Sequence, residues 1–545
     1  MTAIAHNPVL PGFRPDPSVC RVGDAFYAVT SSFEYFPGLP VHRSTDLVHW
    51  EPVGHVIHRE DQLDLSGVAS SGGLFAATIR HHDGRFWVVC TLVGGTGRSG
   101  GFVVTAADPA GPWSDPTWVD GGDGRDGIDP SLLFARDGRA WWCGTRLASP
   151  GAWPEQTQVW VREFDPVGLR LVGDEHVVWH GALEGAVWAE GPHLLEVDEA
   201  QGGGVLLLAS EGGTERHHAV SVARGASPIG PFAGNPGNPV LTHRHLGRGA
   251  PVANVGHADL VDDGRGGWWA LALATRCLDG IDSLQGRETW LVPVAWEDGW
   301  PVFAPGEGRL SREVEVPWAE DDEAEDAGRS AAAGTAAAAG TAGTRLGSLL
   351  EEHFDGPELH PDLIRVRTAP GVDRIGLGAR PGHARLRPTS QSLAEVAPHA
   401  FAGFRLEQPR ARVTAVIEAS GAPGMTAGLA LRQSEARHLR LGVRDGVVEL
   451  VLHVDGDEHV RGTAPAADGS VELELAIDGF AVAARVRTAQ QADADWTEVG
   501  RAGVRPLSSS GIGSFVGVTA GVFATGTNAA DAWADVDVLR VEHVA

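Results

Sequence analysis

Residues 83–89 read DGRFWVV, a turn dipeptide that leads into an aromatic and β-branched run. The same pattern recurs as GDAFYAV at 23–29, DGRAWW at 137–142, GGVLLL at 203–208 and GGWWAL at 266–271. Asp-Gly or Gly-Gly before such a run is a hairpin signal. Further strand patterns precede and follow each copy. The sequence therefore predicts five four-stranded units arranged as a five-bladed β-propeller, with an irregular β-sandwich as the alternative.

A low-complexity segment divides the chain. Residues 319–347 read AEDDEAEDAGRSAAAGTAAAAGTAGTRLG, an acidic run followed by Ala, Gly and Thr without apolar periodicity, which is typical of a linker or insertion. Beyond it, ARVTAVI at 411–417 and VELELAI at 471–477 alternate apolar and polar residues. Alternation indicates sheets with one buried face. The expected all-β organisation is a propeller at 1–318, the linker at 319–347 and a β-sandwich at 348–545.

Composition restricts the partners of the chain. The net charge of -28 disfavours binding to nucleic acid or to anionic membranes, whereas a neutral substrate is not repelled. The amino terminus has neither a basic segment nor a long apolar run, so we expect a cytoplasmic protein. Four cysteines in apolar surroundings, none in a CxxC pair, are expected to be buried and free: Cys20, Cys90, Cys143 and Cys277.

Carboxyl groups stand just upstream of three of the five hairpin turns. DPSV at 16–19 and DPSL at 129–132 nearly match, and the fourth repeat has EGPH at 190–193. If each strand before a turn is the innermost of its blade, Asp16, Asp129 and Glu190 meet at the axis, together with His257 of the fifth repeat. Three ionised carboxyl groups so close together would repel one another, so at least one of them should have a raised pKa. The alternative is that these aspartates only cap turns.

Three clustered carboxyl groups suit glycoside hydrolysis, in which one acid protonates the leaving oxygen and one carboxylate activates water or attacks the sugar. Aromatic residues on the same axial loops would supply apolar faces for sugar rings: Phe33, Tyr35, Phe36, Phe75 and Trp188. Two functions therefore follow from the residues, a glycosidase and a non-catalytic sugar-binding propeller. Only the glycosidase needs all three carboxyl groups.

Further motifs run in order through the first part of the chain, at 7–10, 14–18, 32–38, 44–50, 129–132, 190–193, 211–214, 256–258 and 286–289. Through these motifs the sequence resembles glycoside hydrolase family 43, in particular its two-domain β-xylosidases and α-L-arabinofuranosidases. A retaining fructosidase-like enzyme would share the domain plan, but its Asn-Asp-Pro-Asn, Arg-Asp-Pro and Glu-Cys motifs are absent from the sequence. The second part resembles the family's sandwich domain more weakly, through 354–356 and 515–537.

The resemblance implies an inverting, exo-acting enzyme that releases D-xylose, L-arabinose or both from xylo-oligosaccharides or arabinofuranosides. By position, Asp16 looks like the general base, Glu190 like the general acid and Asp129 like the carboxylate that orients Glu190. Arg287 looks like a residue that binds sugar hydroxyls. The resemblance implies that no cofactor is required. Some family members hold a divalent cation such as calcium beside the residue that matches His257.

Two further expectations concern the pocket walls. Phe75-Ala76-Ala77 stands where family members usually carry Trp-Ala-Pro, so the aromatic face there is smaller than in those members. A Gly-flanked aromatic, Phe523, lies in a segment that resembles the family's wall-forming loop, and we expect it to reach the pocket. The sequence leaves open the choice between xyloside and arabinofuranoside, and whether the chain forms a homo-oligomer.

Overall fold

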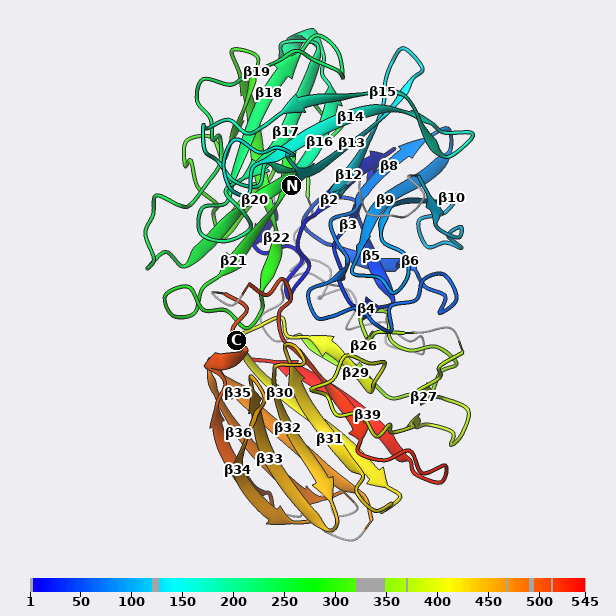
Figure 1. Ribbon diagram of the computed structural model, residues 1–545. Coiled ribbons are helices and arrows are strands. Elements are labelled where there is room, and N and C mark those ends of the chain that lie inside the picture. Colours follow the sequence, from blue (N-terminus) through cyan, green and yellow to red (C-terminus); the bar gives the residue numbers. More distant parts are fainter. Residues whose placement is uncertain are drawn as a thin grey trace, which may run out of the picture.

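The computed structural model describes residues 3–119, 127–319, 348–368, 371–466, 469–489, 495–510 and 513–544. The predicted linker at 319–347 lies, apart from Ala319, outside this range. Two all-β parts lie against each other, the propeller above and the sandwich below in Figure 1. Within the described ranges, none of the helical segments has the length and apolar character needed to cross a bilayer.

Five antiparallel sheets form the blades of the propeller, each with its strands ordered from the axis outward. The first blade holds β2 (Ser18–Val22), β3 (Ala25–Val29), β5 (Gly38–Ser44) and β6 (Glu51–Ile57). The second holds β7 (Gly73–Leu74) and β8 (Thr78–His82) on β9 (Arg85–Val93), then β10 (Gly100–Ala106) and β11 (Thr117–Trp118). The third holds β12 (Ile128–Phe134), β13 (Ala140–Leu147), β14 (Thr157–Asp165) and β15 (Arg170–Trp179).

The last two blades follow the same plan. The fourth holds β16 (Glu190–Glu196), β17 (Val205–Glu211), β18 (Ala219–Gly225) and β19 (Phe232–Gly234), with the 3-10 turn η1 (Glu199–Gln201) between its first two strands. The fifth holds β20 (Val252–Asp262), β21 (Trp268–Arg276), β22 (Arg287–Glu297) and β23 (Trp300–Phe303). The predicted Asp-Gly and Gly-Gly turns join the first strand of a blade to the second, as the repeats indicated.

The blades close into a ring because each packs apolar side chains against both of its neighbours. The inner strands β2, β8, β12, β16 and β20 contact one another in order, and β20 returns to β2. One apolar cluster fills each of the five gaps between adjacent blades. At the gap between the fifth and first blades, β1 (Ala3–His6) pairs with β24 (Glu313–Val316) and joins the two ends of the propeller.

The sandwich consists of two antiparallel sheets around a single apolar core. One sheet runs β27 (Ile375–Gly376), β28 (Ala384–Leu386), β39 (Ala534–His543), β30 (Arg410–Ala419), β35 (Val471–Asp478), β36 (Ala481–Thr488) and β37 (Thr497–Gly503), with β25 (Leu349–Glu352) also on β39. The other runs β34 (Asp457–Pro465), β33 (Val447–Val454), β32 (Arg437–Arg444), β31 (Thr426–Arg432), β38 (Thr519–Thr525), β29 (Ala400–Arg405), β26 (Ile364–Val366) and β4 (Tyr35–Phe36). A 3-10 turn, η2 (Arg505–Leu507), precedes β38.

One strand of the sandwich comes from the propeller half of the chain. β4 leaves the first blade and pairs with β26, Phe36 opposite Arg365 and Tyr35 opposite Val366. Figure 1 shows β4 and β26 at the junction of the two parts. The sequence did not predict this crossing, because a two-residue strand carries no periodicity. Tyr35 and Phe36 therefore extend a sandwich sheet and do not line the site that their loop position suggested.

Candidate active site

A small pocket opens where the inner strands begin, at one end of the propeller axis. Its volume is about 60 Å³. It gathers the three predicted carboxyl groups together with His257, Arg287, Phe33 and Phe75, whereas the other predicted aromatic residues do not line it: Tyr35, Phe36, Trp188 and Phe523. The lining residues are Asp16, Phe33, Phe75, Ala76, Ile128, Asp129, Glu190, Thr214, His257, Arg287 and Phe515.

The backbone of the inner strands is irregular where the pocket residues stand. Asp16 and Asp129 both have φ of 55°, His257 has φ of 37° and Phe33 has φ of 52°, all in the left-handed region. The pairing register shifts beside the pocket in β12, β16 and β20. Bulges of this kind re-aim side chains, and strained φ values concentrate at functional sites. The inner strands thus turn their polar residues toward the axis rather than into the blades.

Gly191 shows how tightly the floor of the pocket is built. Its φ is 56°, and a Cβ placed on it would lie 2.9 Å from the His257 ring. Only glycine fits between Glu190 and this imidazole without displacing it. The Gly191 N–H also donates to Asp129 Oδ2 at 3.0 Å, which ties the Asp129 carboxyl to the residue after Glu190.

Asp16 lies among groups that favour its ionised form. Arg287 Nη1 is 3.1 Å and His257 Nδ1 is 3.4 Å from Asp16 Oδ1, and the Ser31 hydroxyl donates to Oδ2 at 2.7 Å. Burial alone would raise the pKa of Asp16. The Arg287 charge, His257 and the Ser31 hydrogen bond outweigh it, so the pKa lies below its ordinary value. Asp16 is therefore a carboxylate over a wide pH range.

The surroundings of Glu190 and Asp129, unlike those of Asp16, favour the protonated form of the carboxyl group. Burial, followed by the charges of Asp129 and Asp16, raises the pKa of Glu190 well above its ordinary value. Burial also raises the pKa of Asp129 to about 6, against the attraction of His257 and with a further contribution from Asp16. The site therefore contains an ionised Asp16 and a protonated Glu190 at the same pH, which is the condition for a general base and a general acid to act together.

Arg287 connects the base to the rest of the pocket. Its Nη1 donates to Thr214 Oγ1 at 2.8 Å as well as to Asp16, and its Nη2 donates to the Phe515 carbonyl at 3.2 Å. The guanidinium lies 5.5 Å from the centre of the Phe33 ring and 5.0 Å from that of Phe515. One cation thus contacts the carboxylate, two aromatic faces and a backbone carbonyl of the sandwich.

The wall contributed by the sandwich is Phe515, not the predicted Phe523. The rings of Phe33, Phe75 and Phe515 lie 5.6 to 5.9 Å apart and form three sides of an aromatic cluster. Phe523 stands in the middle of β38, paired with Phe401 of β29 and Gly428 of β31, and is fully buried. A residue held in a ladder on both sides cannot leave the sheet. Phe515, in the loop before β38, is the aromatic residue of this segment that reaches the pocket.

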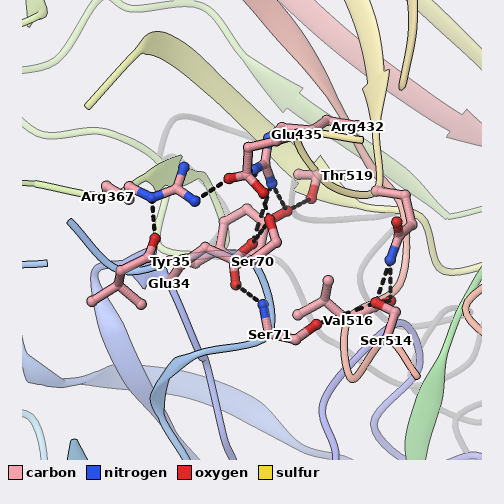
Figure 2. A network of polar contacts seen from close by, with 12 residues as sticks. Glu34, Tyr35, Ser70, Ser71, Arg367, Arg432, Glu435, Ser514, Val516 and Thr519 are labelled. Carbon is pink, nitrogen blue, oxygen red and sulfur yellow. Dashed lines mark hydrogen bonds and ion pairs between the residues drawn. The ribbon is translucent and has the colours of Figure 1, made fainter. Parts of the chain in front are cut away.

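A buried polar network holds this wall against the propeller (Figure 2). Arg432 of the sandwich donates to the Tyr35 hydroxyl at 3.0 Å and to Ser70 Oγ at 2.9 Å, and Ser70 donates to Glu34 at 2.8 Å. The Glu34 carboxylate accepts from the Ser71 N–H at 3.1 Å. The Ser71 hydroxyl then accepts from the N–H of Phe515 at 3.0 Å.

Both charged ends of this network are out of contact with water. Arg432 and Glu34 are fully buried and lie 3.3 Å apart, and Glu435 also accepts from Arg432 at 2.8 Å. Buried charges of this kind persist only where they are paired and hydrogen-bonded. The position of Phe515 therefore depends on groups from both parts of the chain.

Few groups that could bind a metal ion lie beside His257 in the described part of the chain. Its ring contacts a single carboxyl group, that of Asp16, and lies 6.5 Å from the ring of His193. Below it on the axis, the buried Asp259 carboxylate is neutralised by Arg80 at 2.8 Å. Among the described residues there is no cluster of three or more His, Cys, Asp or Glu residues that could hold a metal ion. A divalent cation beside His257 therefore stays a prediction of the resemblance.

Comparison with known proteins agrees with the geometry. The profile of glycosyl hydrolases family 43 matches residues 5–301, and that of the beta xylosidase C-terminal Concanavalin A-like domain matches residues 351–542. A "Xylosidase/arabinosidase" of Butyrivibrio fibrisolvens is 37% identical over 99% of this chain and 100% of its own length. The "Non-reducing end alpha-L-arabinofuranosidase BoGH43B" of Bacteroides ovatus is 34% identical over 96% of this chain and 92% of its own. The crystal structure of a xylan beta-1,4-xylosidase from Bacillus halodurans superposes with a TM-score of 0.85, at 29% identity over 99% and 100% of the two chains.

Proposed function

Since the chain belongs to glycosyl hydrolases family 43 and is a glycosidase, we propose that it removes single terminal pentoses, D-xylose, L-arabinose or both, from oligosaccharides and glycosides with inversion at the anomeric carbon. The observation that carries this proposal is the opposite displacement of the Asp16 and Glu190 pKa values within one small pocket. The names of the full-length relatives support both pentoses.

We assign the roles from the surroundings of each carboxyl group. Asp16 takes a proton from a water molecule as the water oxygen attacks the anomeric carbon. The bond from that carbon to the leaving oxygen breaks, and Glu190 gives its proton to this oxygen. Asp129 contributes charge that keeps the proton on Glu190 until it is needed. Attack on the face opposite the leaving group inverts the configuration.

An exo action is supported by the aromatic wall and the small pocket volume. Phe33, Phe75 and Phe515 surround a space that adjoins the two catalytic carboxyl groups. Arg287 stands between Asp16 and this wall, where it can donate to sugar hydroxyls. A non-catalytic sugar-binding protein would need the aromatic faces and the arginine, but not a carboxyl group that burial and two neighbouring carboxyl groups keep protonated.

The leaving group separates the acid from the base experimentally. The Glu190→Gln enzyme should lose several orders of magnitude of rate on pentose disaccharides, whose leaving alkoxide needs a proton, and far less on activated aryl pentosides. The Asp16→Asn enzyme should lose activity on both. Equal losses on both substrates in Glu190→Gln would show that Glu190 is not the acid.

The stereochemical outcome tests the inversion. A water molecule must fit between base and sugar, so the Asp16 and Glu190 carboxyl groups should be roughly 6.5 to 9.5 Å apart in a substrate complex. An NMR time course of the first product should show the anomer opposite to that of the substrate. A product of retained configuration would exclude Asp16 as a base and make it a nucleophile.

A further inference from the structure

Ser71, in the propeller loop between β6 and β7, contacts the sandwich loop that carries Phe515. The Ser71 hydroxyl accepts from the Phe515 N–H at 3.0 Å and lies 3.3 Å from the Ser514 hydroxyl. Ser514 also accepts from the side-chain amide of Gln433, which follows β31 in the sandwich. The tip of this loop is therefore held from both parts of the chain, and Ser71 holds it from the propeller side.

The backbone of Ser71 is fixed in an uncommon conformation. Its φ is 67°, in the left-handed region, which a serine adopts rarely and keeps only where its surroundings hold it there. Two residues further on, Gly73 has φ of 94°, and a Cβ on it would lie 2.3 Å from the Phe33 carbonyl oxygen. The Ser71 N–H donates to the buried Glu34 carboxylate at 3.1 Å (Figure 2). These contacts fix the direction in which the Ser71 hydroxyl is presented to the loop.

The backbone of Phe515 connects this contact to Arg287. The Phe515 carbonyl oxygen accepts from Arg287 Nη2 at 3.2 Å and from Nε at 3.4 Å. Arg287 Nη1 in turn donates to Asp16 Oδ1 at 3.1 Å. Hydrogen bonds thus run from Ser71 through Phe515 and Arg287 to Asp16. Because Phe515 uses both its N–H and its carbonyl, a displacement at the Ser71 end also moves the oxygen to which Arg287 donates.

The two ends of the loop have partners of their own. The Ser509 N–H donates to the Ser283 carbonyl at 3.1 Å, and the Val518 N–H donates to the Leu284 carbonyl at 2.8 Å. We therefore expect the loop to stay on the propeller when the Ser71 hydroxyl is removed, with the change confined to its tip. Removal of the hydroxyl should then affect Arg287 without detaching the sandwich.

We propose that Ser71 is a positioning residue for the catalytic base. Its hydroxyl fixes the Phe515 backbone, and the Phe515 carbonyl then holds the Arg287 guanidinium against Asp16. The inference rests on the proposed function, because it takes Asp16 as the base. Ser71 does not line the pocket, so it acts through these residues and not on the substrate.

Four other titratable groups also face Asp16. His257 of β20 lies 3.4 Å from its carboxylate, and His218 stands just before β18. The neighbouring carboxyl groups are those of Asp129 and Glu190. Because all four belong to the propeller, a shift at the tip of the sandwich loop should leave their distances to Asp16 unchanged. A change in the ionisation of Asp16 in a Ser71 variant then reports on Arg287.

Ser71→Gly removes the hydroxyl without straining the backbone, because glycine adopts a φ of 67° readily. Ser71→Ala is the second variant, and its free energy of unfolding in urea should not exceed that of Ser71→Gly. In both, KM for an activated aryl pentoside should rise about three- to tenfold, as expected for the loss of one hydrogen bond, with a smaller change in kcat. The acid limb of kcat/KM should move to higher pH by roughly half a unit, since a displaced Arg287 favours the Asp16 carboxylate less.

A double variant tests the route of the effect. In the Arg287→Met background, Ser71→Gly should move the acid limb no further, because Ser71 acts on Asp16 through Arg287. Ser227→Ala is the matched control. Ser227 is also a half-buried serine, and its hydroxyl donates to the Gly230 carbonyl at 3.0 Å in the fourth blade. KM and the acid limb of this control should equal those of the parent enzyme.

The outcomes separate this inference from the function on which it rests. An unmoved KM and acid limb in both Ser71 variants, an equal movement in Ser227→Ala, or an undiminished further movement in the Arg287→Met background would overturn the inference alone. If no pentoside of any kind is hydrolysed by the parent enzyme, the proposed function fails, and the inference fails with it.

Discussion

Replacing Arg287 by Met should move the acid limb of the pH–rate profile to higher pH. Arg287 Nη1 lies 3.1 Å from Asp16 Oδ1, and both side chains are buried. The base must be ionised to accept a proton, and the Arg287 charge favours that ionised form. Without this charge the carboxylate takes up a proton more readily. Activity should therefore be lost at a higher pH as the solution is acidified.

The size of the change follows from the contact distance. Two unit charges 3.1 Å apart interact by about 5 kcal/mol at an effective dielectric constant of about 20. This is an upper figure, because His257 and the Ser31 hydroxyl still stabilise the Asp16 carboxylate after the substitution. Opposite charges at this distance typically displace the titration of a carboxyl group by about 1 to 3 pH units. We therefore expect the acid limb to move by about 1 to 2 pH units.

The assay is kcat/KM of the free enzyme from acidic to neutral pH, measured with an activated aryl pentoside so that proton donation by Glu190 is not limiting. Arg287→Lys should restore part of the displacement, since it keeps a positive charge. Arg505→Met is the matched control, because Arg505 pairs with Asp279 and Asp282 on the surface. A uniform loss of rate at every pH, with an unmoved limb, would refute the electrostatic role and leave Arg287 as a sugar-binding residue only.

Three other changes test the remaining parts of the site. Asp129→Asn should move the basic limb of the profile to lower pH, because the Asp129 charge helps to keep Glu190 protonated and its removal lets that proton leave earlier. Phe515→Ala should raise KM for terminal pentosides by about tenfold, with a smaller change in kcat, since it removes one aromatic face of the pocket. Arg432→Met should lower the free energy of unfolding in urea by about 3 to 5 kcal/mol, because it leaves the buried Glu34 carboxylate without its cation. Arg501→Met, at an exposed ion pair, should leave the same free energy nearly unchanged.

Much of the propeller and its carboxyl groups could be predicted because the signals are local and repeated. Each turn dipeptide marks the hairpin between the first two strands of a blade, and the strand upstream of the turn begins at the axis. The positions of Asp16, Asp129 and Glu190 at the start of these strands therefore predict that the three carboxyl groups meet. Their φ values and the bulges beside them could not be read from the sequence, since they depend on neighbours from other blades.

The errors lie where the two parts of the chain meet. Phe523 and Phe515 both stand near glycines in one segment, and no local pattern says which of them is inside a strand. Pairing of β38 with both β29 and β31 decides the question, and those partners are far away in sequence. The same holds for β4, where two residues of the propeller become the edge of a sandwich sheet.

These contacts between the two parts also determine how the sandwich should be tested. Removing residues 349–545 would eliminate the Phe515 wall, but it would also remove the partner strand of β4 and expose the buried Glu34 and Tyr35. A loss of activity in that truncated chain would then report on folding as much as on the wall. Arg287 donates both to Asp16 and to the carbonyl of Phe515, so a displaced wall is also expected to disturb the base. Single substitutions in the loop, with KM and the acid limb measured together, separate these effects because they leave the pairing of β4 with β26 intact.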